Sequence, residues 1–512
     1  MKNQLDRREF LKLAGLVPVS LAAGRFLANP GIGAIHTQSS PEPKNVLVVV
    51  FDAWSAYNIS LYGYARQTTP NLARLAERAV VYHNHFAGGN FTTPGTASLL
   101  TGALPWSHRA FRYNSTVAES FATQNFFSAF QNHYRIAYSH NPLVNTLFDQ
   151  FHEHIDEYVP QSRLFLLNDG PIQTLFKHDQ DIATVSWARA IKRSEFGYSY
   201  SLYLAHLYER LRERKIKRYK PEYPRGLPNV TGDNYFLLDQ AVDWLGDRLL
   251  AAPSPFMAYF HFLPPHFPYK THRDFAGALK GDGFEPVYKP WDIFHENKSP
   301  DNLLKARTDY DEFILYADRE FERFFKHLEE SGLLENTWVV LTGDHGELFE
   351  RGIMGHSTPM MIQPINRIPL MVFEPGRRER LDIYTPTSAA DVLPTLLHVT
   401  GQAPAGWTEG SVLPPFAPSE PDPDRSLYAV EAKKNDQFAP FVLASFMMVK
   451  WPYKLAYYFG YKELDGGERV DLYDIQADPE EMNNLYPAQP AVSAAMFDEL
   501  KARLAEKNEP YR

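Results

Sequence analysis

Three apolar runs, each ending in an acidic or histidine residue, constrain the fold of this chain most strongly. An unbroken apolar run is typical of a parallel strand buried on both faces, whereas a half-exposed strand alternates apolar and polar residues. In open α/β sheets, functional sites assemble beyond the carboxyl ends of such strands. The runs are NVLVVVFDAW, which contains Asp52; PFMAYFHFLPPH, which ends at His266; and NTWVVLTGDHGE, which contains Asp344 and His345.

Helical patterns separate these runs and indicate the fold class. Apolar spacing predicts helices at residues 71–79, at about 309–331 and at 389–401. Shorter apolar runs at 80–87 and 367–376 predict two further strands. Because strands that alternate with helices form a doubly wound, mostly parallel sheet flanked by helices, we expect an α/β fold. A chain of 512 residues is long enough for one such domain and a smaller appendage.

The end of the chain has a different pattern and predicts a small α+β subdomain. The proline-rich stretch PPFAPSEPDPD (414–424) marks a boundary. We therefore expect the larger domain over residues 44–413 and the subdomain over 425–512. Within the subdomain, segments 441–459 and 469–475 predict a small antiparallel sheet, and segment 491–507 predicts an amphipathic helix.

The composition excludes several kinds of site. The chain has no cysteine, which rules out disulfides, thiolate metal sites, a cysteine nucleophile and any modified nucleophile made from cysteine. Its formal net charge is −9, so no global electrostatic attraction favours a nucleic-acid partner.

The first 40 residues predict a signal peptide and a polar spacer. Arg7 and Arg8 precede Phe-Leu-Lys at 10–12, and a mildly apolar run follows at 13–24. This order is similar to a bacterial twin-arginine signal, which implies a periplasmic or other extracytoplasmic location and the twin-arginine export machinery as a partner. The alternative is an ordinary amphipathic first helix. The run is too short for a bilayer span of about 20 residues. We expect no other transmembrane helix, and an uncleaved signal would associate the protein with the membrane.

Residues 150–230 fit the alternation of strands and helices poorly, and we interpret them as an insert. The insert contains RLRERKIKRYK (210–220), which holds seven basic residues and one acidic residue. This segment is either the solvated face of a charged helix or part of a cap that contacts an anionic or lipid substrate.

Asp52, Asp344 and His345 are candidate metal ligands. Each has a structural explanation when taken singly, because an aspartate after a strand often caps a helix and Asp-His-Gly can form a turn. Together they offer two hard oxygens and an imidazole at the carboxyl ends of strands, a set that suits one divalent cation. A threonine oxygen would complete this set. The stretch NFTTPGTASLLTG (90–102) offers Thr92 and Thr93 near the start of a predicted helix.

The order of these motifs resembles the sulfatase family of the alkaline-phosphatase superfamily. The resemblance covers about residues 44–490 and is weakest over 150–230. It implies an alkaline-phosphatase-like fold and a metal-dependent ester hydrolase. The motifs that carry it are NVLVVVFDAW, YGYARQTTPNLARLAERA, TTPGTASLLTG, FHFLPPHFPY, TGDHGELFERGIMGHS, RIPLMVF and RVDLYDIQADPEEMNNL, in chain order.

The resemblance implies a metal set and a nucleophile. Asp52, Asp344 and His345 correspond to metal ligands of the family. Thr92 falls on the nucleophile, two residues before Pro94 in the pattern Cys/Ser/Thr-x-Pro, and its oxygen would also contact the metal.

Two histidines have implied roles in catalysis. His266 and His356 fall where the family places groups that contact the transferred anion or protonate the leaving oxygen. Thr93 lies one residue off the nucleophile pattern, and we expect it to cap the helix instead.

Departures from the family pattern bear on the mechanism. The best-known sulfatases convert a cysteine or serine to formylglycine and place an arginine two residues after the proline; the corresponding residues here are Thr92 and Thr96. Ala53 stands where a second acid is often found. His345 stands where calcium sulfatases often have asparagine, as in the manganese or zinc branch. The resemblance therefore implies one divalent cation, and Mn, Zn, Ca and Mg all remain open.

A threonine nucleophile favours phosphorus over sulfur. A formylglycine hydrate expels sulfate by elimination through its second hydroxyl, whereas a threonine sulfate has no such exit. A phosphothreonine can be released by in-line attack of water or another alcohol. The leading hypothesis is an exported metal-dependent hydrolase of phosphodiester, phosphonate or related esters, sulfate esters included, with a small-molecule, lipid or glycan substrate. The alternatives are a transferase of phospho-alcohol headgroups in the cell envelope and a binding protein that has lost turnover.

Overall fold

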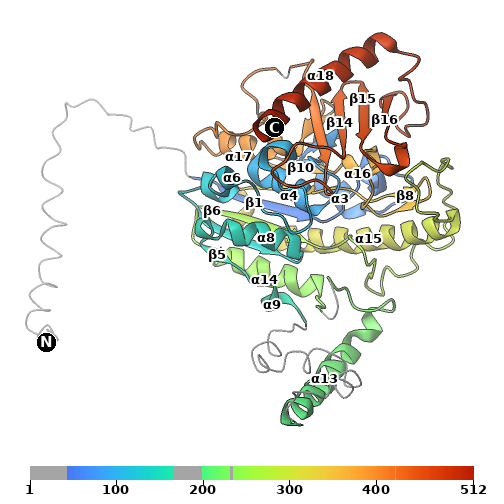
Figure 1. Cartoon of the computed structure of the whole chain (residues 1–512). Helices are drawn as coiled ribbons and strands as arrows, with labels where there is room; N and C mark the ends of the chain where they lie inside the picture. The colour runs from blue at the N-terminus through green and yellow to red at the C-terminus, as the bar shows by residue number, and fades with distance from the viewer. Residues whose placement is uncertain (1–42, 167–198, 231–233, 421) are drawn as a thin grey trace, which may run out of the picture. The chain divides into compact units, whose positions relative to one another are not determined.

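A central sheet of eight strands forms the core of the protein (Figure 1). The computed structural model describes residues 43–166, 199–230, 234–420 and 422–512. The strands are Asn45–Phe51 (β1), Val80–Tyr82 (β2), Tyr134–Ser139 (β4), Glu157–Tyr158 (β5), Phe256–Phe262 (β6), Thr337–Gly343 (β7), Leu370–Phe373 (β10) and Leu381–Ile383 (β11). Their order is β11-β2-β10-β7-β1-β6-β4-β5, and β10 is antiparallel to both neighbours while the other described pairs are parallel. The expected mostly parallel α/β sheet is confirmed.

Helices cover both faces of this sheet, as strand β1 shows. All seven of its residues are buried. Alternate residues, such as Val49, pack in a cluster that includes α3 (Pro70–Leu75), α14 (Leu238–Leu250) and α15 (Pro300–Glu330). The intervening residues, such as Val48, pack in a second cluster with α4 (Thr92–Thr101), α8 (Pro142–Gln150) and α17 (Val392–Val399). The unbroken apolar run in the sequence reflects this two-sided burial.

The long helix α15 begins earlier than apolar spacing predicts. Ser299 caps its N-terminus by accepting a hydrogen bond from the backbone of Asn302, and Pro300 occupies the first helical position. Both are typical helix starts. The first turns are largely polar and exposed, which is why the apolar pattern begins only later.

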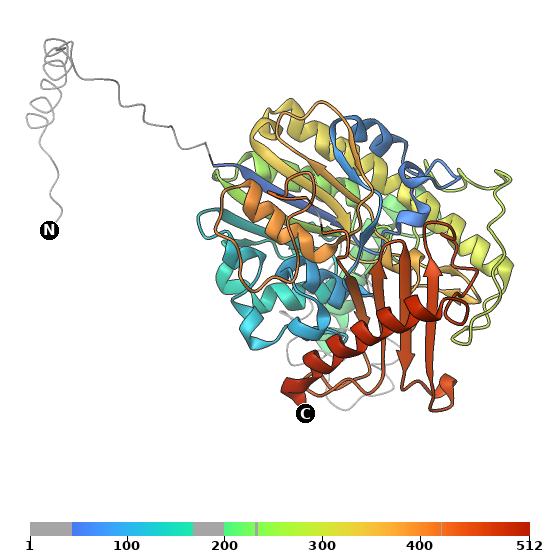
Figure 2. The same ribbon diagram turned by 90° about the horizontal axis from the view of Figure 1, so that it is seen from above.

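The C-terminal segment forms the expected small sheet subdomain. Its antiparallel strands are β13 (Leu427–Glu431), β14 (Ala444–Lys450), β15 (Tyr453–Phe459) and β16 (Glu468–Asp474). Helix α18 (Pro490–Asn508) lies across one face of this sheet (Figure 2) and contributes Met496 and Leu500 to its core. The opposite face packs against residues 348–365, which follow β7. The subdomain therefore supports the loop that carries Asp344 and His345.

Short elements connect these layers. They are β3 (His85–Phe86), α5 (Pro105–His108), α6 (Glu119–Ala122), α7 (Phe126–Ala129), α9 (Gln161–Leu164), β8 (Phe349–Glu350), β9 (Ile353–Met354), α16 (Gln363–Asn366) and β12 (Thr387–Ser388). Of the predicted insert, the structure describes its two ends and the helix α13 (Ser199–Tyr219). The predicted signal segment lies outside the described residues. Among the helices that are described, none is long and apolar enough to cross a bilayer.

Candidate active site

Four neighbouring strands bring polar residues to one edge of the sheet. Asp344 follows β7, Asp52 follows β1, His261 lies near the end of β6, and Asn141 follows β4. All four side chains are buried. Parallel strands end at the same edge, so residues far apart in the chain meet there.

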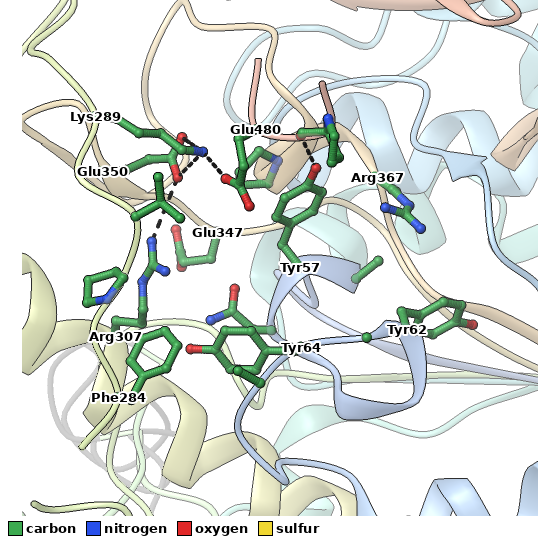
Figure 3. Close-up of a pocket in the computed structure, with 18 of the residues that line it drawn as sticks. Tyr57, Tyr62, Tyr64, Phe284, Lys289, Arg307, Glu347, Glu350, Arg367 and Glu480 are labelled. Atoms are coloured by element: carbon green, nitrogen blue, oxygen red, sulfur yellow. Dashed lines mark hydrogen bonds and ion pairs between the residues drawn. The ribbon is translucent and has the colours of Figure 1, made fainter. Parts of the chain in front are cut away.

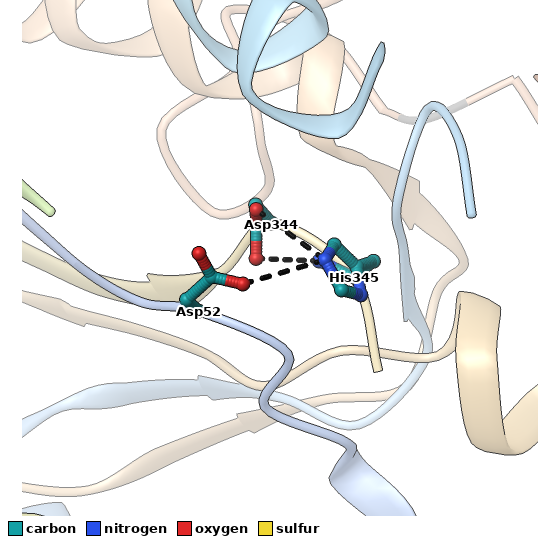
Figure 4. A group of neighbouring side chains, drawn as sticks. All are labelled: Asp52, Asp344 and His345. Carbon is teal, nitrogen blue, oxygen red and sulfur yellow. Dashed lines mark hydrogen bonds and ion pairs between the residues drawn. The ribbon is translucent and has the colours of Figure 1, made fainter. Parts of the chain in front are cut away.

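Four donor atoms converge at this edge. His345 Nε2 lies 3.4 Å from Asp52 Oδ1 and 3.7 Å from Asp344 Oδ2, as Figure 4 shows. Thr92 Oγ1 lies 3.5 Å from Asp52 Oδ1 and 3.4 Å from His345 Nε2. The predicted metal ligands and the predicted nucleophile are therefore adjacent.

Asp52 has one oxygen committed to protein contacts. Asn141 Nδ2 donates to Asp52 Oδ2 over 2.5 Å, and His261 Nε2 lies 3.3 Å from the same oxygen. Asn141 Nδ2 also lies 3.3 Å from Thr92 Oγ1. Asp52 Oδ1 is thus left facing the convergence point.

Asp344 likewise has one oxygen committed to protein contacts, here with backbone amides. The amides of Ala53 and His345 donate to Asp344 Oδ1 over 3.1 and 3.0 Å. Ala53 adopts a left-handed backbone conformation, with φ of 58°. Such strain at a non-glycine residue is concentrated at functional sites, and here it aims the amide at Asp344. At residue 53 the chain therefore contributes the backbone amide of Ala53, which donates to Asp344, instead of a second acidic side chain.

The donor set fits a divalent cation. His345 Nδ1 lies 2.9 Å from its neighbour's carbonyl, Gly346 O, so the Nδ1 proton is donated there and Nε2 is directed at the two carboxylates. Metal-binding histidines are commonly oriented by such a bond. Ligand bonds of about 2.1 Å place neighbouring donors roughly 3.0–3.4 Å apart. His345 Nε2 lies 3.4 and 3.7 Å from the two carboxylates, close to that range, and the three donor atoms all lie within 4.8 Å of one another.

The buried carboxylates of Asp52 and Asp344 favour a positive charge between their side chains and that of His345. Burial raises the pKa of Asp344, and repulsion from Asp52 raises it further. Burial opposes ionisation of Asp52, but attraction to His266 and hydrogen bonds from His261 and His345 hold its pKa well below the usual range. Burial also lowers the pKa of His345, yet attraction to Asp344 and the contact with Asp52 raise it overall to about 9. The carboxylates thus favour either a proton or a metal cation at Nε2.

Helix α4 packs closely against the loop that follows β7 and so places Thr92 beside Asp52 and His345. Thr92 is the first residue of α4 and is buried. Gly95 permits the approach, because a Cβ there would lie 2.2 Å from the carbonyl oxygen of Asp344. One turn after Thr92, Thr96 Oγ1 donates to Asp344 Oδ2 over 3.4 Å. Thr96 therefore contacts a candidate metal ligand.

The predicted cap role of Thr93 is wrong. The N-cap of α4 is Phe91, and no side chain forms a cap hydrogen bond. Thr93 is the second helical residue, and its buried hydroxyl has no hydrogen-bond partner among the described residues. Because α4 begins inside the protein, packing rather than capping fixes its first turn.

His266 and His356 lie together beside this cluster. The rings of His356 and His345 are 4.2 Å apart, and those of His356 and His266 are 5.0 Å apart, between centroids. His356 Nδ1 lies 2.9 Å from Glu347 Oε1, which leaves Nε2 available. Burial lowers the pKa of His356 to about 4. His266 is partly exposed to solvent.

The sequence did not identify Asn141, His261 or Glu347 as site residues. His261 lies within an apolar run and reads as a strand residue. Glu347 follows the recognised Asp-His-Gly turn, so its position gave a usable signal. Asn141 follows β4, which was not predicted because Tyr134 and Arg135 interrupt its apolar pattern.

A separate cavity of about 380 Å³ has Glu347 in its wall (Figure 3). Its charged groups are largely paired with one another: Lys289 Nζ lies 2.8 Å from Glu350 and 2.6 Å from Glu480. None of the four convergent residues lines it. This cavity is therefore distinct from the edge that carries Thr92.

The class of protein follows from the fold and from comparison with known families. The chain is an ester hydrolase with an alkaline-phosphatase-like fold. It belongs to the sulfatase family, whose model, described as Sulfatase, matches residues 44–402. The resemblance in the sequence motifs is confirmed.

Relatives act on both sulfur and phosphorus esters, judging by their names. A choline-sulfatase of Rhizobium meliloti (strain 1021) is 26% identical over 454 residues, which cover 81% of this chain and 77% of that protein. The multifunctional alkaline phosphatase superfamily protein PehA of Trinickia caryophylli is 23% identical over 508 residues, which cover 89% of this chain and 93% of that protein. The crystal structure of a phosphonate monoester hydrolase of Agrobacterium radiobacter superposes with a TM-score of 0.65 at 18% identity, covering 91% of this chain and 96% of that one.

Proposed function

We propose that the protein is an exported, metal-dependent hydrolase of phosphodiester, phosphonate or related esters, in which Thr92 is the nucleophile. The observation that carries this proposal is the position of Thr92 Oγ1, 3.5 Å from Asp52 and 3.4 Å from His345. Asp52, Thr92, Asp344 and His345 would hold one divalent cation. When bound, the cation supplies positive charge that favours the alkoxide form of the threonine and offsets charge on the ester oxygens.

The protein's own residues then have distinct tasks. The Thr92 hydroxyl donates to Asp52 and would attack the ester phosphorus. Attack forms a bond between Thr92 Oγ1 and phosphorus, breaks the bond to the departing alcohol, and leaves a phosphoryl- or phosphonyl-threonine that keeps the substrate's other substituent. Water hydrolyses this ester in a second in-line step. His266 protonates the departing oxygen, because its exposure lets it recover a proton from solvent. His356, oriented by Glu347, contacts the non-bridging oxygens through Nε2.

An activity panel tests the reaction class. The metal-loaded protein is incubated with aryl phosphodiester, phosphonate, phosphate and sulfate esters. Faster turnover of a phosphorus diester or phosphonate supports the proposal, and faster turnover of the sulfate ester contradicts it. No turnover of any ester by fully loaded protein would indicate a binding protein instead.

The cation is tested separately from turnover. Asp344→Ala should abolish metal uptake, measured by elemental analysis, since it removes one carboxylate at the convergence point. Equal uptake by this variant and the native protein would contradict the ligand assignment. The metal that co-purifies, among Mn, Zn, Ca and Mg, identifies the ion.

A headgroup transferase is the second candidate. The same threonine ester can be attacked by an alcohol in place of water. Product analysis in water containing glycerol separates the candidates. Transfer to glycerol in excess of its mole fraction indicates a transferase.

Export is tested on the paired arginines. A double variant with Arg7→Lys and Arg8→Lys should remain in the cytoplasm, because the twin-arginine pathway reads this pair. Normal export of the variant through that pathway contradicts the signal assignment.

A further inference from the structure

We propose that the outer face of helix α13 docks the protein onto an anionic lipid bilayer. This outer face consists of Leu207, Arg210, Leu211, Arg214, Lys217 and Arg218. The proposal concerns where the enzyme works and does not depend on the reaction proposed above.

The two leucines of this face are unusually exposed. Leu207 is 44% exposed and Leu211 is 54% exposed, and their spacing of four residues places them on the same side of the helix. Leucines on a helix that packs against a protein normally face that protein. On α13 they face away from the described part of the protein, so both are available to contact another apolar environment.

Cations surround these leucines on the same face. With about 100° of rotation per residue, all six outer-face residues fall within roughly 120° of arc. Arg210, Arg214, Lys217 and Arg218 are all exposed. Glu213 lies just beyond this arc, 3.8 Å from Lys217. The protein as a whole carries a net charge of −9, so this positive face stands out from its surroundings.

The other side of α13 fixes this orientation. Ile216 and Tyr219 pack against the main hydrophobic core, and Lys215 Nζ donates to the carbonyl of Leu166 over 2.6 Å. In Figure 1 the helix extends away from the central sheet. Because its C-terminal end is anchored, α13 cannot rotate its leucines inward without losing these contacts.

Leucine and arginine on one face match the chemistry of an anionic membrane surface. Interfacial helices bury their apolar residues at the level of the headgroups, while long cationic side chains reach the phosphates. Each basic residue near such a surface strengthens binding by roughly fivefold. A soluble acidic protein would satisfy the arginines but would leave the leucines exposed, so the combination favours lipid.

A chain of packed residues links the C-terminal part of α13 to the candidate active site. Phe165, next to Leu166, forms a β-bridge with Phe236. The ring of Phe236 stacks on His140 with centroids 4.2 Å apart, and His140 precedes Asn141, which contacts Asp52.

Vesicle binding tests the charges of the outer face. The full chain is sedimented with vesicles of phosphatidylcholine alone or of equal parts phosphatidylcholine and phosphatidylglycerol. A triple variant with Arg210→Glu, Arg214→Glu and Arg218→Glu should bind the mixed vesicles at least about a hundredfold more weakly. The matched control, Lys326→Glu, Lys462→Glu and Lys501→Glu, loses the same charge from exposed positions elsewhere and should bind normally. Equal loss in both variants, or in neither, overturns the proposal.

Fluorescence tests the leucines directly. Because the chain has no cysteine, Leu211→Cys can carry a single environment-sensitive probe, with Lys501→Cys on α18 as the control. The probe at 211 should shift to the blue on mixed vesicles, and the probe at 501 should not. A blue shift at 211 that grows with protein concentration in the absence of lipid would show that a second copy covers the face, and the proposal would be wrong.

The same assays separate this proposal from the proposed function. Thr92→Ala should bind mixed vesicles as tightly as the native protein, and the triple arginine variant should keep its activity on a small soluble aryl ester. Loss of that soluble activity would show that the triple variant damages the fold, and the fluorescence result would then decide.

Discussion

Asn141 shows how one side chain can orient both a candidate ligand and a candidate nucleophile. Its Nδ2 donates to Asp52 Oδ2 and lies 3.3 Å from Thr92 Oγ1, while its Oδ1 accepts the amide of Leu143 at the start of α8. The hydrogen bond to Leu143 at the start of α8 orients the Asn141 carboxamide, and the carboxamide in turn orients the carboxylate of Asp52. Residues that hold a metal ligand in place in this way commonly contribute about 10- to 100-fold to metal affinity or activity.

Asn141→Ser separates these two tasks. Serine can still cap α8 but cannot reach Asp52, so we expect an unchanged melting temperature and about 10- to 100-fold weaker metal binding. Metal titration by calorimetry checks this prediction. Asn141→Ala, which loses the cap as well, should also be less stable by about 1 kcal/mol. Native metal affinity in Asn141→Ser would show that Asp52 needs no such support.

At the scale of elements, the close contact between α4 and the β7 turn decides the geometry of the site. Gly95 is the point of contact, with a backbone atom of Asp344 as its neighbour. A backbone carbonyl cannot rotate away as a flexible side chain can. The position of Thr92 therefore depends on a glycine that has no chemical role itself.

Gly95→Ala should push α4 away from Asp344. We expect destabilisation by about 1–3 kcal/mol, as for other overpacked cores, together with weaker metal uptake. Urea unfolding and elemental analysis measure the two effects. Gly406→Ala is the control, because a Cβ at Gly406 meets no atom within 4 Å. A normal metal content in Gly95→Ala would show that the helix can shift without disturbing the site.

Elements buried on both faces could be predicted from the sequence, and the others could not. β1 and β7 lie in the middle of the sheet, so their apolar runs are unbroken. β4 pairs with the two-residue strand β5 near the edge, and its first two residues are partly exposed. Missing β4 meant missing Asn141. The reach of side chains across the sheet, as for His261 and Asp52, is set by tertiary packing that no local pattern contains.

At the scale of the whole molecule, buried neutral histidines couple stability to pH. Burial lowers the pKa values of His85 and His108 to about 3. His108 Nδ1 accepts the amide of Ala110, so protonation would break that bond. A folded-state pKa below the unfolded value of about 6.5 means that stability is full above pH 6.5 and is lost as pH falls toward 3.

The free energy of unfolding should therefore fall between pH 6.5 and pH 5. Each such histidine contributes a slope of about 1.4 kcal/mol per pH unit. His108→Asn keeps an acceptor for Ala110 but does not titrate in this range, so its slope should be smaller by about that amount. Urea unfolding at several pH values measures both proteins. Identical slopes would show that His108 is already protonated in the folded state.

The central claim is that Thr92 carries the reaction, and trapping the intermediate tests it most directly. The metal-loaded protein is mixed with a slow aryl phosphonate or phosphodiester, quenched rapidly, digested and analysed by mass spectrometry. We predict that the added mass lies on Thr92 itself. Thr92→Ala should remain folded but should lose the modification and at least about a thousandfold in rate, whereas Thr93→Ala should retain both. Full turnover by Thr92→Ala, or a modification on another residue, would contradict the account.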